Sequence, residues 1–301
     1  MARQPRAGSR AVAIVATALL AVGVGALALA ALQRTDAAGP VGSAAPAPTF
    51  TFGEQATGSP SPTETDAAPD AVSAAATERF IAVDGGEVWR ATAGACGSAD
   101  AAPVAPVVEY STDGGATWQV VTPPDVRQVL NVAVFGVGQG EVIAATGDAC
   151  EPAALRTDTA GRAWESYPQV LATSTYVSPT DRASVVTGGA AVAAPCADAR
   201  SARTSRGTTG IVCDGTAYVL SDGQWTALVG GAVALDAVAG TIVAAHVSDA
   251  CPGGVTVTRF SDAPGEQLGC VTDVDASAPA AISVLGSDLV FWSADTVRPL
   301  S

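Results

Sequence analysis

Two patterns of hydrophobic residues divide the chain. Residues 11–32 form an uncharged apolar run of 22 residues, AVAIVATALLAVGVGALALAAL, without an amphipathic helical period. A membrane-spanning helix needs about 20 such residues. From about residue 78 onward, short stretches rich in Val, Ala, Ile and Thr alternate with turns that contain Gly, Asp and Pro. This second pattern is typical of an all-β domain, which we expect over residues 78–301.

The charges around the apolar run indicate its orientation. Arg3, Arg6 and Arg10 precede it, and no acidic residue occurs before Asp36. The positive-inside rule therefore predicts that residues 1–10 are cytoplasmic and that everything after the run is extracytoplasmic. We expect residues 11–32 to remain as a transmembrane signal anchor in the cell membrane.

A cleaved signal peptide, which would leave a secreted protein, is the alternative. The apolar core of a signal peptide is usually about 7–15 residues long. Small-x-small cleavage sites do occur at residues 26–28 and 28–30, but both lie inside the apolar run.

Residues 33–77 are rich in Ala, Pro, Thr, Ser and Gly, and they lack the apolar content that would offset the entropy of ordering. We expect a disordered linker here. Residues 49–52, which alternate Thr and Phe, are the exception, because they have the pattern of a strand.

The exported part is strongly acidic. After Arg34 the chain has 11 Arg and no Lys against 29 acidic residues, which gives 11 − 29 = −18. Such a surface repels phosphate backbones, so the sequence excludes a nucleic-acid-binding protein.

A repeated unit occurs within the β domain. A strand that ends in a Cys-containing loop recurs as VWRATAGAC, VIAATGDAC and IVAAHVSDAC, and each copy is followed by another strand and a polar Gly turn. The turns read STDGGATW (111–118), TDTAGRAW (157–164), SDGQW (221–225) and SDAPGEQL (261–268). A period of about 45 residues with four short strands per unit is typical of the blades of a β-propeller.

The first of these turns resembles a known motif. STDGGATW matches the Asp-box, S/T-x-D-x-G-x-x-W, of BNR-repeat β-propellers, which include bacterial sialidases, sortilin-like receptor domains and photosystem II assembly-factor-like propellers. The second turn has its Asp one place early, the third is shortened, and the fourth has Leu268 in place of Trp. The resemblance implies structural Asp-box roles for Ser111, Asp113, Gly115, Trp118, Thr157, Gly161, Trp164 and Trp225. The Lys-free, Ala- and Arg-rich composition is typical of high-GC bacteria. The resemblance is therefore to BNR-repeat propellers of a membrane-anchored, actinobacterial type.

The physical role of the motif is to fasten a turn. Gly114 and Gly115 permit the positive φ angles of a tight hairpin. Asp113 is expected to accept hydrogen bonds from turn amides, and Trp118 to wedge between adjacent sheets. A catalytic carboxylate at Asp113 is the alternative hypothesis.

The repeat predicts about five four-stranded blades, with an irregular or six-bladed ring as the alternative. The blades are expected at 79–124, 127–170, 174–229, 231–275 and 279–301. The last blade is short, and residues 48–52 are expected to complete it, because an open sheet edge favours aggregation.

The third predicted blade contains an insertion, residues 194–213. Arg200, Arg203 and Arg206 lie in it and form the only basic cluster after residue 34. This candidate ligand loop would bind an anionic cell-wall polymer or an acidic partner, although a solvated insertion explains it equally simply.

Six cysteines lie in the exported part, and an even count there predicts three disulfides. Cys196 with Cys213 and Cys251 with Cys270 are expected to pair locally, because each pair falls within one predicted blade. Cys96 and Cys150 occupy matching loops of neighbouring blades, so we expect them to pair with each other. No C-x-x-C pair or Cys/His cluster occurs, so neither a metal nor another cofactor is expected.

Catalysis is poorly supported. A sialidase needs an Arg triad, a Tyr–Glu pair and an Asp acid, but the Arg-Ile-Pro signature is absent and residues 78–82 (ERFIA) are the nearest match. His246 is the only histidine and reads as a half-buried strand residue. Trp89 and Trp292, on second strands of their blades, are expected to pack in the core, with a ligand platform as the alternative.

The sequence therefore favours a membrane-anchored extracytoplasmic propeller that acts as a non-catalytic binding or assembly module. Its partner would be an extracytoplasmic protein or a cell-envelope glycan. The alternative is a secreted sialidase-like enzyme or another glycoside hydrolase.

Overall fold

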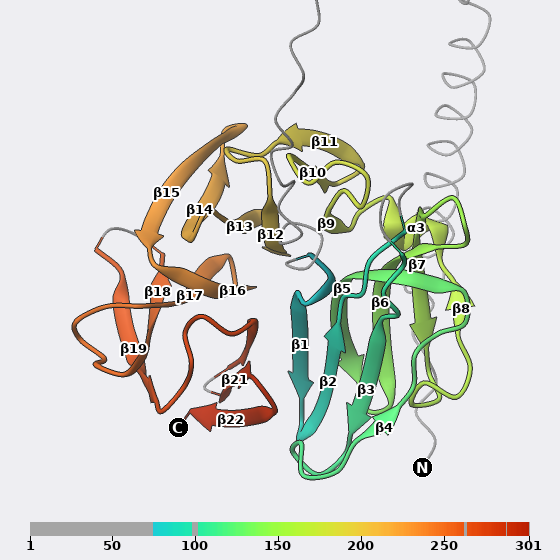
Figure 1. Cartoon of the computed structure of the whole chain (residues 1–301), viewed down its shortest axis with the longest axis horizontal. Helices are drawn as coiled ribbons and strands as arrows, with labels where there is room; N and C mark the ends of the chain where they lie inside the picture. The colour runs from blue at the N-terminus through green and yellow to red at the C-terminus, as the bar shows by residue number, and fades with distance from the viewer. Residues whose placement is uncertain (1–74, 98–101, 262–263, 287, 301) are drawn as a thin grey trace, which may run out of the picture. The chain divides into compact units, whose positions relative to one another are not determined.

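Six antiparallel sheets are arranged around a common axis in the computed structural model, which describes residues 75–97, 102–261, 264–286 and 288–300 (Figure 1). The first strand of each sheet lies near the axis and the last strand lies at the rim. The domain is therefore a six-bladed β-propeller.

The strands follow one another blade by blade. Blades 1 and 2 contain β1 (Arg79–Asp84), β2 (Glu87–Thr92), β3 (Val107–Ser111), β4 (Gln119–Val120), β5 (Val126–Gly136), β6 (Gln139–Thr146), β7 (Glu151–Thr157) and β8 (Glu165–Ser166). A short helix, α3 (Pro168–Leu171), leads into blade 3, which contains β9 (Thr175–Val177), β10 (Ser184–Thr187) and β11 (Ala190–Ala193). Blade 4 contains β12 (Ala199–Ser205), β13 (Thr208–Cys213), β14 (Thr216–Ser221) and β15 (Gln224–Gly230). Blades 5 and 6 contain β16 (Ala232–Val238), β17 (Thr241–His246), β18 (Gly254–Phe260), β19 (Glu266–Thr272), β20 (Ala280–Leu285), β21 (Asp288–Ser293) and β22 (Thr296–Leu300).

The prediction of about five blades is wrong by one blade, and the six-bladed alternative is confirmed. Residues 174–229 were expected to form one blade with an insertion at 194–213, but they form blades 3 and 4. Most of the supposed insertion is β12 and β13, the two inner strands of blade 4. Blade 3 was missed because its hairpin between β10 and β11 is closed by two glycines, Gly188 and Gly189, and carries no Trp-containing turn.

The hydrophobic core lies between the blades. Six buried clusters are found, and each joins two neighbouring blades, including blade 6 with blade 1. The strand β17 is covered on both faces, so all six of its residues except Thr241 are buried, and four of these five are apolar. Trp89 on β2 and Trp292 on β21 are both buried, which confirms that they pack in the core on second strands.

Three disulfides connect all six cysteines, as predicted: Cys96–Cys150, Cys196–Cys213 and Cys251–Cys270. The first of them joins the loop after β2 to the loop after β6, so it ties blade 1 to blade 2. Disulfides persist in oxidising compartments, and three of them indicate an extracytoplasmic or secreted protein.

Several predictions concern residues outside the described part of the chain. These are the anchor at 11–32, the linker up to residue 74 and the additional strand at 48–52. No helix within the described residues is long and apolar enough to cross a membrane. Ala75 and Ala76, at the end of the predicted linker, are buried, so the propeller begins slightly earlier than expected.

Candidate functional site

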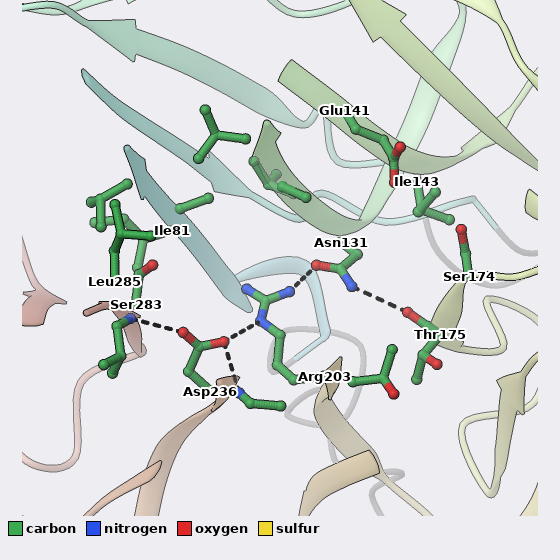
Figure 2. Close-up of a pocket in the computed structure, with 18 of the residues that line it drawn as sticks. Ile81, Asn131, Glu141, Ile143, Ser174, Thr175, Arg203, Asp236, Ser283 and Leu285 are labelled. Carbon is green, nitrogen blue, oxygen red and sulfur yellow. Dashed lines mark hydrogen bonds and ion pairs between the residues drawn. The ribbon is translucent and has the colours of Figure 1, made fainter. Parts of the chain in front are cut away.

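A central pocket of about 410 Å³ opens at one end of the propeller axis, where inner strands of all six blades meet (Figure 2). Its wall contains apolar side chains such as Ile81 and Leu285 and hydroxyl groups such as those of Ser174 and Ser283. Sites for small ligands usually have volumes of about 300–1,000 Å³. The pocket is therefore the first candidate for a functional site.

The inner strands do not all run in the same direction. From β12, β16 and β20, residues near the C-terminal end of each strand line the pocket. From β9, by contrast, it is the first residue, Thr175, that lines the pocket. Thus β9 runs opposite to the other inner strands. The segment that contains α3 causes this reversal, because it brings the chain back to the pocket before β9 begins: Val170 and Ser174 both line the wall.

Arg203 is the central residue of the pocket. It is buried on β12, and its guanidinium group donates a hydrogen bond to the side-chain oxygen of Asn131 on β5. Its Nε atom lies 3.8 Å from a carboxylate oxygen of Asp236 on β16, and its Cζ atom lies 5.2 Å from the ring centre of Phe80 on β1. Asn131 in turn donates to the carbonyl oxygen of Thr175 on β9, at 3.1 Å.

Asp236 completes this network. One carboxylate oxygen accepts a hydrogen bond from the N–H of Ala237, and the other from the N–H of Val284 on β20, both at 2.8 Å. Burial raises the pKa of Asp236, and the nearby Arg203 and these two N–H groups oppose that shift. Burial likewise lowers the pKa of Arg203. Through Arg203, Asn131 and Asp236, one polar network contacts an inner strand of every blade (Figure 2).

The second carboxylate in the pocket is also paired. Glu141 on β6 lies 2.7 Å from the guanidinium of Arg156 on β7. The Cζ atom of Arg156 lies 4.9 Å from the ring centre of Phe135 and 5.5 Å from that of Tyr167. Each acidic side chain of the central pocket thus has an arginine partner.

A second cavity, of about 480 Å³, lies where the inner strands β12 and β20 begin, and therefore at the other end of the axis. Glu78 is buried there and accepts hydrogen bonds from the N–H of Ser201, at 2.7 Å, and from Arg182, at 3.0 Å. Arg182 also pairs with Asp198. These residues join blade 1 to blades 3 and 4.

The predicted Asp-box residues lie at hairpins between third and fourth strands, away from both cavities. The Ser111 hydroxyl accepts a hydrogen bond from the N–H of Gly115 at 2.8 Å, and Asp113 accepts from the N–H and the hydroxyl of Thr117 at 2.8 Å and 2.6 Å. These bonds from Thr117, together with one from the Ser111 hydroxyl, lower the pKa of Asp113 to about 2.

The second turn makes the same contacts with different residues. The Thr157 hydroxyl accepts from the N–H of Gly161 at 3.0 Å, and the Thr159 hydroxyl accepts from the N–H of Ala163 at 2.9 Å. Thr159 therefore stands where the motif has Asp. We propose that both turns serve the fold.

The tryptophans of these hairpins contact the preceding blade. The indole N–H of Trp164 donates to the carbonyl oxygen of Val121 at 3.1 Å, and that of Trp225 to the carbonyl oxygen of Ala193 at 2.8 Å. Trp118 packs into the cluster between blades 6 and 1. The Cζ atom of Arg90 lies 3.8 Å from the centre of its ring.

The three arginines of the predicted ligand loop do not form one surface. Arg200 and Arg203 are on β12, and Arg206 is exposed in the turn that follows. The expectation of an exposed loop is wrong because β12 is an inner strand whose Arg203 faces the pocket. Arg200 lines the cavity at the other end of the axis, so a single ligand cannot contact all three.

His246 lies on β17 and is buried, as a strand residue. Its Nε2 atom lies 2.9 Å from the Thr258 hydroxyl, and burial lowers its pKa. Among the described residues, no three His, Cys, Asp or Glu side chains gather in a way that suits a metal ion.

Of the central network, Arg203 was a sequence candidate, whereas Asn131 and Asp236 were missed, although a signal for them exists. Asn131 interrupts the apolar run VLNVAV, and Asp236 interrupts VALDAV. A single polar residue inside a buried strand needs a partner, and such residues are expected to meet at a common axis.

Comparison with known proteins gives neighbours at the level of the fold. No protein-family model and no curated protein matches the chain. Among solved structures, "YCF48 bound to D1 peptide" has 14% identity and a TM-score of 0.39, over 73% of this chain and 75% of that one. Hadza microbial sialidase Hz136 has 11% identity and a TM-score of 0.32, over 73% and 51%. A mutant of AofleA from Arthrobotrys oligospora has 10% identity and a TM-score of 0.41, over 75% and 87%.

The three TM-scores are below 0.5, so these likenesses bear neither on ligand or activity nor on the family of the chain.

Proposed function

We propose that this protein is a non-catalytic binding or assembly module that acts outside the cytoplasm and is held at the membrane by residues 11–32. One observation carries the non-catalytic part: both acidic side chains of the central pocket, Glu141 and Asp236, are paired with arginines. A catalytic acid, base or nucleophile must instead direct its carboxyl group at a substrate.

The surroundings of Asp236 are especially unsuited to catalysis. Each of its oxygens accepts a main-chain N–H, and its pairing with Arg203 holds blades together. Glycoside hydrolysis needs two carboxyl groups that face the bond to be cleaved from opposite sides. With Asp236 occupied in this way, the pocket offers hydroxyl groups, main-chain groups and apolar surface, which suit the binding of a protein segment or a cell-envelope glycan.

The test compares two arginine substitutions at exposed positions. Leu285 lines the rim of the pocket, whereas Val137 is exposed in the turn between β5 and β6 and does not line it. Purified ectodomain is passed over immobilised cell-envelope polysaccharide and over envelope protein. We expect one of these two materials to retain the wild-type ectodomain. Retention should fall about tenfold for Leu285→Arg and should not change for Val137→Arg. Equal retention of all three proteins would contradict a ligand site at the central pocket.

The alternative function, a sialidase-like or other glycoside hydrolase, has one observation in its favour. Glu141 and Asp236 line the same pocket, and two carboxylates are the minimum that such an enzyme needs. A panel of fluorogenic glycosides that includes a sialoside tests this directly. The proposed function predicts no turnover above the blank. Turnover that Glu141→Gln abolishes, in a protein with an unchanged melting temperature, would establish the hydrolase instead.

A further inference from the structure

An interblade groove of about 760 Å³ lies between blades 4 and 5, at the ends of the strands nearest the rim. Its floor contains Val219 and Leu228 from blade 4 and Ile242 and Phe260 from blade 5. The exposed residues Thr226 and Ala227 of β15 form one wall. This groove is separate from the central pocket.

Three of the other five blade junctions show one side chain that can fill such a position. At the junctions of blades 6 and 1, 1 and 2, and 3 and 4, a Trp from the hairpin between third and fourth strands packs against the preceding blade: Trp118, Trp164 and Trp225. Two of these indoles also donate a hydrogen bond to a main-chain carbonyl of that blade. A planar aromatic ring with one N–H donor is therefore the side chain that this architecture places between blades.

Blade 5 lacks this side chain. Its hairpin has Leu268 at the Trp position, and Leu268 packs into the cluster between blades 5 and 6, on the other side of the sheet. The junction with blade 4 thus receives no aromatic ring from the hairpin position that supplies one elsewhere.

The glycine of each hairpin shows the same difference. A Cβ atom on Gly115 would meet Val297 of blade 6 at 3.7 Å, and one on Gly161 would meet Val121, which follows β4 of blade 1, at 2.4 Å. A Cβ atom on Gly265, by contrast, would meet Thr258 and Phe260 of its own blade, at 2.6 Å and 2.7 Å. Gly265 therefore lies against its own sheet and not against blade 4.

We propose that the interblade groove binds an aromatic side chain, Trp above all, from an extended segment of a partner protein. The ring would take the place that Trp164 and Trp225 occupy at their junctions. The main chain of the partner would lie along β15, the outermost strand of its sheet, whose outer edge has no partner strand among the described residues. An unpaired edge offers main-chain hydrogen bonds to an added strand, and an adjacent pocket gives specificity for one side chain.

The probe is the peptide Ac-Ala-Trp-Ala-amide, titrated into the ectodomain by calorimetry and NMR, beside Ac-Ala-Leu-Ala-amide and free indole. The Trp peptide is expected to give saturable shifts at groove residues and to bind about tenfold more tightly than the other two ligands. Equal affinity for the Leu peptide contradicts aromatic specificity. Equal affinity for indole contradicts a partner segment, because the peptide main chain then adds nothing.

Matched substitutions locate the site. Thr226→Arg introduces a large charged side chain into the groove from an exposed position of β15, so the protein should fold normally. Ala190→Arg makes the same change on the exposed edge strand β11 of blade 3 and is the control. We expect Thr226→Arg to weaken peptide binding at least about tenfold and the control to leave it unchanged. Unchanged affinity in Thr226→Arg overturns the proposal, and it leaves the proposed function of the central pocket standing.

Discussion

Arg203 and Asp236 form an ion pair near the propeller axis, with Nε and Oδ1 3.8 Å apart and both side chains shielded from solvent. The pair joins blade 4 to blade 5, and its further hydrogen bonds reach blades 2 and 6. The hydrophobic clusters between blades act only between neighbours, whereas this network connects blades across the axis. It therefore helps to fix the number of blades that surround the axis.

Arg203→Ala should strongly destabilise the protein. The substitution leaves Asp236 buried without its cation, and the loss of one partner of a buried pair costs about 3–5 kcal/mol. Arg206→Ala, at an exposed position three residues away, is the control and should change stability by no more than about 0.5 kcal/mol. Urea denaturation measures both. The double substitution Arg203→Met with Asp236→Leu should recover only the part of the loss that comes from the unpaired charge, because the N–H groups of Ala237 and Val284 then lose their acceptor. If Arg203→Ala were as stable as Arg206→Ala, the axial pair would have no structural role.

The position of Arg203 on a buried inner strand shows where sequence reasoning failed. The stretch ARSARTS was interpreted as part of an inserted loop and a candidate ligand site, and it has no run of apolar residues. Yet its residues include Ser201 and Arg203, which are buried through hydrogen bonds and ion pairs with other blades. A strand that is stabilised by polar contacts with distant segments has no local hydrophobic signal, so a blade was lost from the count.

Features with local causes were predicted well. The hairpins of blades 1, 2 and 4 carry Trp within short Gly turns, and the positions of these blades' outer strands followed from them. The disulfide pairing followed from the repeat, because Cys96 and Cys150 occupy the same loop in successive units. The reversal of β9 and the meeting of Asn131 with Arg203 depend on tertiary packing alone, and no local pattern indicates them.

Trp118→Ala should weaken the closure of the ring. Trp118 packs between blade 1 and blade 6, which no disulfide joins. Truncation of a large aromatic side chain in a core costs about 3–5 kcal/mol. Val120→Ala, two residues away at a position that is 69% exposed, is the matched control and should have little effect. Chemical denaturation measures the free energy of unfolding of both variants. If Trp118→Ala lowered it as little as Val120→Ala does, Trp118 would not act as a wedge between the blades.

The three disulfides should differ in their contributions. On the loop-entropy account, a bridge across 54 residues stabilises by about 4 kcal/mol, and bridges across 17 or 19 residues by about 3 kcal/mol. We therefore expect the Cys96→Ser, Cys150→Ser double variant to melt at a lower temperature than the corresponding variants of the two local bridges. Calorimetric melts of the three variants under identical conditions check the order, and the reverse order would show that local strain outweighs chain entropy.

The anchor at residues 11–32 remains a prediction. In cells, the propeller should stay in the membrane fraction and be accessible to protease added from outside, because the apolar run is long and preceded by arginines. Sequencing of the mature N-terminus gives the decisive result. A soluble product that begins after Ala28 or Ala30 would establish a secreted protein instead.

The pH dependence of stability tests the role of Asp113. Hydrogen bonds from the Thr117 hydroxyl, the Thr117 N–H and the Ser111 hydroxyl lower its pKa from 3.8 to about 2 in the folded protein. In the unfolded chain this pKa returns to about 3.9. A carboxyl group whose pKa is lowered by folding stabilises the protein fully above its unfolded pKa, and this stabilisation disappears as the pH falls through the folded pKa. Asp113→Asn should therefore melt below the wild type at pH 7, and the two melting temperatures should converge between about pH 4 and pH 2. The measurement is a series of thermal melts of both proteins across this range. If Asp113→Asn melted like the wild type at every pH and yet abolished a measured activity, the structural role of this turn would be wrong and a catalytic one would replace it.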